Sequence, residues 1–429
     1  MYAFEFNNTI QLGTIVGGVQ SDGGNSPNGW ERWRVSGFIS PSLTLENASN
    51  HWELWRDDIN IMKQMGLKTC RLCLDWARIE PREGAFCEQA ISRVAQELYH
   101  LRLAGISPLL TLHRFSEPMW FTNRGGWERK ENITYFLKYA ERIVRTLGHL
   151  VSEYITLDEP NLYAVNGYFR GIWPPGKTSK SSAMQMMSVI ASTHIRSYKL
   201  IHAVHRELGF SSVSVGCSVH MRALEPKNPR NPFHMATLYS LDRSFQVSII
   251  DALVSGVFRG GLKNYALSHE GIYADFIGLG YYTRNYIASR GNSLKNNTPR
   301  GDLSWEIYPQ GIVECAERLT RMCSLPIYIT SNGVCDNDDT LRSRFIYEHL
   351  AAIARSSLPI ERYYYRSLLD GFEWPGTGSE RFGLIGFDSQ TGERNIKKSG
   401  EFFTKIIQSD GVSEEMYKEY VAWQKYRTD

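Results

Sequence analysis

The sequence has 429 residues, of which 42% are hydrophobic, and 48 basic against 45 acidic side chains leave a formal net charge of +3. This composition is ordinary for a globular protein, and neither sign of charge forms a long run, which argues against a nucleic-acid or membrane-surface partner. No stretch approaches the ~20 apolar residues of a membrane span. Residues 1–9 lack the basic-then-apolar pattern of a secretion signal, so we expect a cytoplasmic protein.

The predicted elements alternate between strand and helix along the chain. In order they are a strand over 11–20, a helix over 51–65, a strand over 69–76, a helix over 88–104, a strand over 108–113, a helix over 133–150, a strand over 154–157, a helix over 183–208, a strand over 212–220, a mostly helical stretch over 233–257, a strand over 275–282, a helix over 310–322, a strand over 326–330, a helix over 341–356, a strand over 360–368 and a helix over 401–408. The first helix is typical: Trp52, Trp55, Ile59 and Met62 share one face, and Gly66 ends it.

Eight strands that each precede a helix indicate a parallel sheet, and eight such units fit a closed (β/α)8 barrel of the TIM type. The chain shows no internal repeat and no low-complexity linker, so we expect one α/β domain over residues 1–429. In such barrels the active site lies at the C-terminal ends of the strands. Residues that end the predicted strands are therefore the candidates for function.

Two strand ends carry the most informative residues. Asp158 and Glu159 follow the predicted strand over 154–157, and Pro160, which has no N–H to donate, stops the ladder there. A carboxyl group at the tip of a buried strand is partly desolvated, which raises its pKa and suits a general acid. The strand over 326–330 ends in Ser331, Asn332 and Gly333. Glu159 and Ser331 lie at the ends of the fourth and seventh predicted strands, so a closed barrel would bring them to one pocket.

Further motifs occur in a fixed order along the chain. They are Arg71 with residues 76–81, Gly125-Gly126-Trp127, residues 167–176, residues 275–283, residues 367–374 and Arg381-Phe382-Gly383-Leu384. Together with the two strand ends, they resemble glycoside hydrolase family 1 from about Leu12 to about Ile407. That family carries a Thr-Leu-Asn-Glu-Pro motif with the acid/base Glu and an Ile-Thr-Glu-Asn-Gly motif with the nucleophile Glu.

The resemblance implies a role for several residues of the pocket. Glu159 would be the acid/base, and Arg71 and Tyr282 would flank the nucleophile position. Gln20 would hold sugar hydroxyls and Glu373 the hydroxyls at positions 4 and 6. Trp374 would pack beside the sugar.

This sequence departs from the family pattern at five pocket positions. Arg114 stands where the family has a His that reads a sugar hydroxyl, and Asp158 replaces the Asn before the acid/base. Gly280 replaces the Asn of Asn-Tyr-Tyr, Ser331 the nucleophile Glu, and Arg366 the Trp that floors the sugar site. Five departures in one pocket favour natural divergence over an engineered replacement of a single nucleophile.

The replacements change both the charge and the chemistry of the pocket. A serine hydroxyl is a weak nucleophile and cannot stabilise an oxocarbenium ion by charge, so ordinary retaining hydrolysis should be lost or slowed. The pocket is about two charge units more positive than the family pattern, so one hypothesis is a ligand with an anionic group. The alternative is that Arg114 or Arg366 pairs with Asp158 or Glu159 and only neutralises it.

Three functions remain open from sequence. The first is a β-glycosidase or transglycosidase with an altered second step. The others are a non-hydrolytic, biosynthetic enzyme that uses Glu159 on a different or anionic ligand, and a pocket that only binds. In each case the partner is a small glycoside or a related polyhydroxylated molecule. No phosphate-binding loop, dinucleotide fingerprint or His-Glu-x-x-His motif occurs, so we expect no cofactor and no catalytic metal.

Overall fold

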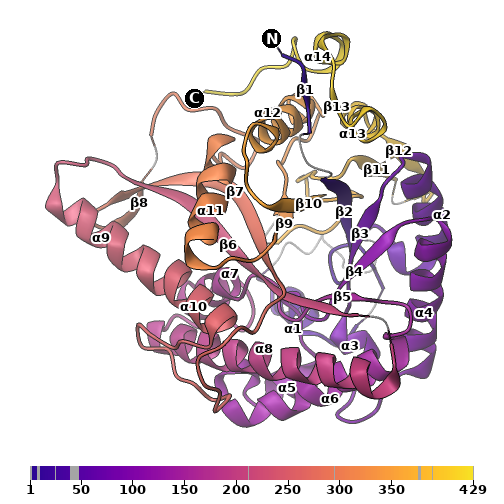
Figure 1. Cartoon of the computed structure of the whole chain (residues 1–429), viewed down its shortest axis with the longest axis vertical. Coiled ribbons are helices and arrows are strands. Elements are labelled where there is room, and N and C mark those ends of the chain that lie inside the picture. The colour runs from indigo at the N-terminus through magenta and orange to yellow at the C-terminus, as the bar shows by residue number, and fades with distance from the viewer. Residues whose placement is uncertain are drawn as a thin grey trace.

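The computed structural model describes residues 2–6, 10–24, 26–38, 48–210, 212–293, 295–374, 378–388 and 390–428. Residues 1 and 7–9, which belong to the N-terminal segment considered above for a secretion signal, lie outside this set. Within the described residues, eight parallel strands close a barrel, which confirms the predicted fold (Figure 1). They are β2 (Gln11–Gly17), β3 (Thr69–Cys73), β4 (Ser107–Thr111), β5 (Glu153–Ile155), β6 (Ser214–Pro226), β7 (Phe276–Ala288), β9 (Ile327–Asn332) and β10 (Ile360–Tyr365).

The ring closes because neighbouring strands pair in parallel register all the way round. The order is β2, β3, β4, β5, β6, β7, β9 and β10, and β10 returns to β2 with Tyr363 opposite Leu12. Inside the ring, one apolar layer is formed by Ile15, Cys73, Leu109, Ile155, Phe276, Tyr328 and Tyr364. Such layers fill a TIM barrel, so its interior is a packed core and not a channel.

Each barrel strand is followed by a helix that covers the outside. The covering helices are α2 (His51–Gln64), α4 (Glu88–Leu103), α6 (Ile133–Leu147), α8 (Lys180–Leu208), α10 (Ser248–Ser255), α11 (Gln310–Met322), α12 (Arg342–Ala354) and α13 (Lys398–Ser409). In α6 the buried residues Phe136, Ala140, Ile143 and Leu147 recur at helical spacing, which gives one apolar face toward the barrel. Among the described residues, no helix is both long and apolar enough to cross a membrane.

Shorter elements lie between these units. They are α1 (Gly29–Val35), α3 (Trp76–Ile79), α5 (Met119–Asn123), α7 (Pro160–Tyr163), α9 (Pro232–Asp242) and α14 (Glu414–Tyr420), the 3-10 turns η2 (Gly126–Glu128) and η3 (Lys130–Asn132), the π-helical turns η4 (Ala164–Phe169) and η5 (Arg243–Val247), and the strands β1 (Phe4–Glu5), β8 (Gly291–Ser293), β11 (Ile385–Phe387), β12 (Arg394–Ile396) and β13 (Gly411–Val412). β1 pairs with β13, so the N-terminal strand lies beside the segment between α13 and α14 (Figure 1).

Two strands are longer than predicted. The strand predicted to end at His220 continues to Pro226, and the one predicted to end at Tyr282 continues to Ala288. The two extensions pair with each other, Ala223 opposite Arg284 and Pro226 opposite Ile287, so their backbone groups stay satisfied beyond the barrel rim. In Figure 1 this ribbon reaches outward toward β8 and α9.

Other predicted boundaries were also inexact. The strand predicted over 69–76 ends at Cys73, and Trp76 begins α3 instead. The stretch predicted as mostly helical over 233–257 divides into α9, η5 and α10. The last barrel strand, predicted to reach residue 368, ends at Tyr365. The chain then turns toward the cavity described below.

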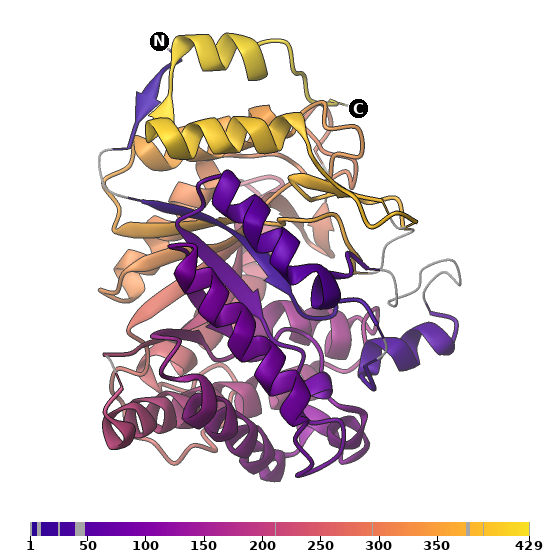
Figure 2. The same cartoon turned by 90° about the vertical axis from the view of Figure 1, so that its right-hand side faces the viewer.

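A buried ionic network joins the first covering helices, which lie side by side in Figure 2. His51 at the start of α2 contacts Asp58 through Nδ1 and Glu97 of α4 through Nε2, both over 2.7 Å. Arg394 of β12 donates from Nε to Asp58 over 2.7 Å. Burial alone would lower the pKa of His51, but Glu97 and Asp58 raise it to about 9. The imidazole is therefore a cation at neutral pH and neutralises buried carboxylates.

Candidate active site

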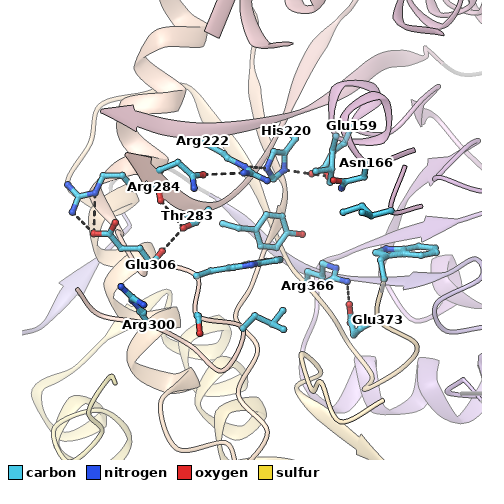
Figure 3. A pocket seen from close by; sticks show the side chains of 18 of the residues that line it. Glu159, Asn166, His220, Arg222, Thr283, Arg284, Arg300, Glu306, Arg366 and Glu373 are labelled. Atoms are coloured by element: carbon cyan, nitrogen blue, oxygen red, sulfur yellow. Dashed lines mark hydrogen bonds and ion pairs between the residues drawn. The ribbon is translucent and has the colours of Figure 1, made fainter. Parts of the chain in front are cut away.

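A cavity of about 380 Å³ opens at the C-terminal ends of the barrel strands (Figure 3). Its wall includes side chains from the ends of β4, β5, β6, β7 and β10 and from the segments that follow them. Its lining includes Arg114, Glu159, His220, Arg222, Tyr282, Arg366, Glu373 and Trp374. Active sites of this fold occupy the same face.

Glu159 is held at the cavity wall by its backbone. Its φ of 40° places it in the left-handed region, and Pro160 begins α7 directly after it. Its N–H donates to the carbonyl oxygen of Ser218 on β6 over 2.9 Å. The residue is 3% exposed, so the carboxyl group lies largely out of bulk water while it faces the cavity. A carboxyl group so placed can exchange a proton with a bound ligand.

Gly280 makes the space that the Glu159 carboxylate occupies. A Cβ atom built on Gly280 would lie 1.7 Å from Glu159 Oε1, far inside van der Waals contact. Any residue with a side chain at 280 therefore requires the carboxylate to move. Glu159 can hold its carboxylate in this position only because residue 280 is a glycine.

A short chain of polar contacts leads to Glu159 from the outer ribbon (Figure 3). Arg222 Nε donates to His220 Nε2 over 3.1 Å, so that nitrogen accepts and the proton of the neutral ring is on Nδ1. Nδ1 lies 3.7 Å from Glu159 Oε2. Burial lowers the pKa of His220, which favours the neutral ring. His220 therefore presents an N–H to the Glu159 carboxylate.

Asp158 lies behind the cavity wall between two arginines. Arg71, which is fully buried, places Nη2 2.6 Å from Asp158 Oδ1, and Arg114 places Nε 3.6 Å from Oδ2. Burial alone would raise the pKa of Asp158, but Arg71 and then Arg114 lower it below its ordinary value. Asp158 is thus a permanent anion at neutral pH. The pairing predicted as the alternative to an anionic ligand is present for Arg114.

Ser331 lies beneath Tyr282 at the end of β9. The Tyr282 hydroxyl and the Ser331 hydroxyl are hydrogen-bonded to each other. Burial raises the pKa of Tyr282 to about 12, so the phenol is neutral at neutral pH. Neither partner is a base, so this contact does not activate the Ser331 hydroxyl as a nucleophile.

Arg366 and Glu373 form an ion pair at the inner end of the cavity. The Arg366 guanidinium also lies 4.4 Å from the centre of the Phe382 ring, and Gln20 Nε2 donates to Glu373 Oε2 over 3.3 Å. Between Gln20, Arg114, Arg366 and Glu373 a void of only about 10 Å³ remains, room for about one water molecule. The part of the pocket that the resemblance assigns to sugar hydroxyls is therefore narrow in this arrangement.

Trp374 closes the cavity with other aromatic rings. Its ring centre lies 4.2 Å from that of Trp30 and 5.8 Å from that of Trp173. Its Nε1 has no hydrogen-bond partner within the described residues. The indole N–H is therefore a buried donor that the described side chains leave unsatisfied.

The structure brings most of the expected residues together, but at different depths. Glu159, Tyr282, Arg114, Arg366, Glu373 and Trp374 line the cavity. Arg71, Asp158, Ser331 and Gln20 lie behind that lining and contact it.

Sequence reasoning missed His220 and Arg222. His220 had a signal, because it ends a predicted barrel strand, where functional side chains collect. Arg222 had none, because its place depends on the unexpected extension of β6.

Fold and site together define a class, the (β/α)8 barrel proteins whose cavity at the C-terminal face combines carboxyl and aromatic side chains. The profile of glycosyl hydrolase family 1 matches residues 4–412, so the chain belongs to that family. It is 26% identical to β-glucosidase A of Acetivibrio thermocellus over 438 positions, which cover 92% of this chain and 95% of the relative. Its structure resembles a β-glycosidase from Pyrococcus horikoshii with a TM-score of 0.88 and 30% identity, over 97% and 98% of the two chains.

A relative of another activity is also similar. The chain is 25% identical to a galactolipid galactosyltransferase of Arabidopsis thaliana over 86% of its own length and 60% of that protein. The proteins similar to this chain therefore include one named for transfer as well as β-glucosidases.

Proposed function

We propose that this chain is a carbohydrate-active enzyme that acts on a β-glycoside in the cavity, with Glu159 as its acid/base. The observation that carries the proposal is the Glu159 carboxyl group, buried, facing the cavity and contacted by His220. Its proton would go to the glycosidic oxygen as the C–O bond breaks, while the oxygen of a water or of an acceptor hydroxyl forms the new bond at the anomeric carbon and gives up its proton to Glu159. Membership of a family that includes β-glucosidases supports this substrate class.

Ser331 would not act as the nucleophile. A retaining glycosidase needs a second carboxyl group about 5 Å from the first, and Ser331 offers only a neutral hydroxyl bonded to Tyr282. Asp158 does not replace it, because Arg71 and Arg114 engage both of its oxygens. In the proposal Arg71 and Tyr282 keep their places around the nucleophile position, and ordinary retaining hydrolysis is slow.

Turnover of aryl β-glycosides by the native chain, Ser331→Glu and Glu159→Gln tests this function. Ser331→Glu should raise hydrolysis, because it restores the second carboxyl group. Adding Glu159→Gln to that variant should then lower turnover of a glycoside with a poor leaving group by roughly 10²–10⁴-fold, the usual worth of a positioned general acid. Ser289→Glu, outside the cavity lining, is the matched control and should leave turnover unchanged. Hydrolysis that is indifferent to Glu159 would contradict the proposal.

A second function is favoured by the narrow inner end of the cavity. The void of about 10 Å³ among Gln20, Arg114 and Arg366 leaves little space for a sugar ring in the usual position. A non-hydrolytic enzyme or a transferase that uses Glu159 on a differently shaped or acidic ligand would fit it, and the galactosyltransferase relative supports such a change. Absence of glycoside turnover in both the native chain and Ser331→Glu would favour this function over the first.

A further inference from the structure

The charges of the cavity do not balance. Seven basic and four acidic side chains line it. Three of the basic groups have carboxylate partners: Arg114 with Asp158, Arg284 with Glu306, and Arg366 with Glu373. Within the described residues, the other four, Arg170, Arg222, Lys295 and Arg300, have no carboxylate within 4 Å. The sequence suggested excess positive charge at Arg114 and Arg366, which lie at the inner end of the cavity. The unpaired cations lie instead in its outer part.

Arg222 is the best placed of these cations. Its Nε donates to His220 and its Nη1 donates to Asn285 Oδ1 over 3.2 Å, so two neutral groups fix the guanidinium in one orientation. Nη2 has no partner among the described residues. A planar guanidinium held in this way presents a free N–H edge suited to a carboxylate, sulfate or phosphate.

The surroundings of Arg222 lack the counter-charge that a sheltered cation needs. Burial and the nearby Arg170 both lower the pKa of Arg222, while Glu159 opposes them. Glu159 is turned toward Gly280 and His220 and makes no ion pair with Arg222. A cation taken out of water next to another cation is unfavourable unless an anion joins them.

Apolar surface lies at the same cavity. Ile172 and Trp305 line it and remain 38% and 44% exposed, although both are large apolar side chains. The Trp305 ring centre lies 5.8 Å from that of Tyr282. An aromatic or other apolar body could pack here while its charged group meets the arginines.

We propose that the outer part of the cavity is a binding site for an anionic aglycone, an apolar body with a carboxylate or similar acid that Arg222 and Arg170 hold. This deepens the proposed function, since it rests on a glycosidic bond that lies beside Glu159. The inner arginines, Arg114 and Arg366, take no part, because each already has a carboxylate.

Equilibrium binding of three probes at pH 7 tests the site. They are 4-carboxyphenyl β-D-glucoside, its neutral methyl ester and free 4-hydroxybenzoate, measured by calorimetry. The native chain should bind the acid about tenfold more tightly than the ester, as one charge-assisted hydrogen bond provides. Arg222→Gln should abolish that difference and leave the ester within twofold. Arg170→Gln, which leaves the contact between Arg222 and His220 in place, should reduce the difference in affinity between acid and ester. Arg230→Gln, an exposed arginine beyond β6, is the matched control and should change neither.

The outcomes separate this site from the proposed function. The anion site is overturned if the native chain binds acid and ester with equal affinity, or if Arg222→Gln weakens the binding of both by the same factor. Either result leaves the glycoside proposal standing. Binding of 4-hydroxybenzoate that depends on Arg222, without binding of either glucoside, supports the anion site and overturns the glycoside proposal. If no probe binds, both are overturned.

Discussion

Asp158→Asn should destabilise the protein strongly, although it restores the residue that the family pattern has. Asp158 is 2% exposed and contacts Arg71 and Arg114 over 2.6 and 3.6 Å. The amide keeps an oxygen acceptor for Arg71 but removes the charge that balances two buried guanidinium groups. Breaking a buried ion pair on one side costs about 3–5 kcal/mol, and we expect a loss of that size in the free energy of unfolding.

Arg114→His in the same chain should cost less, because Asp158 keeps Arg71. Two unit charges 3.6 Å apart attract by about 5 kcal/mol at an effective dielectric constant of about 20, before the cost of desolvation. Most of that gross attraction is offset, so the two substitutions should show a coupling energy of roughly 1–3 kcal/mol. The double variant should therefore be more stable than the sum of the single losses predicts.

Urea denaturation, monitored by tryptophan fluorescence, measures this double-mutant cycle on the native chain, the two single variants and the double variant. It should be run near pH 7, where the depressed pKa of Asp158 keeps the carboxylate ionised in the folded state. Its stabilising effect would be present above the unfolded pKa and would fade only as pH falls through the lower folded pKa. Losses that add within about 0.5 kcal/mol would refute the idea that Arg114 and Asp158 act as a pair.

Two further predictions concern Gly280 and His51. Gly280→Ala should push the Glu159 carboxylate aside and lower the free energy of unfolding by about 1–3 kcal/mol. It should nevertheless lower turnover strongly, and adding it to Glu159→Gln should cost nothing more; an independent loss in the double variant would contradict this. Since the folded pKa of His51 is raised to about 9, its stabilisation should be complete below about pH 6.5 and lost as pH rises through 9. The difference in melting temperature between the native chain and His51→Gln should therefore shrink between pH 6.5 and 9.5, and a constant difference would exclude this role.

The eight βα units could be predicted because each strand is an apolar run and each covering helix has one apolar face. α6 is the clear case, with Phe136, Ala140, Ile143 and Leu147 on one side. The extensions of β6 and β7 could not, because Arg222, Glu225 and Arg284 interrupt the apolar pattern. Those residues stay in strand because the two extensions pair with each other, which is a contact between distant segments.

In the candidate site too, some features could be predicted from sequence and others could not. Glu159 and Ser331 follow from motifs next to predicted strands, and their meeting follows from barrel geometry. The partners of Arg114 and Arg366 do not, because sequence leaves open which carboxylate each arginine reaches. Arg366 takes Glu373, which was expected to serve the ligand. Side-chain direction over a distance of a few ångströms decides such pairings, and no local pattern encodes it.

The volume shared by Gly280 and Glu159 also constrains the order in which this pocket can change. An asparagine at 280 would clash with the carboxylate that fills that space, and Asp158→Asn alone would leave Arg71 and Arg114 without their shared counter-charge. Substitution toward the family pattern at 158 or at 280 alone should therefore give a less stable or less active protein. A laboratory selection for glycosidase activity from this chain should recover paired changes, 114 with 158 and 280 with a new conformation of Glu159, before any benefit from position 331 is complete.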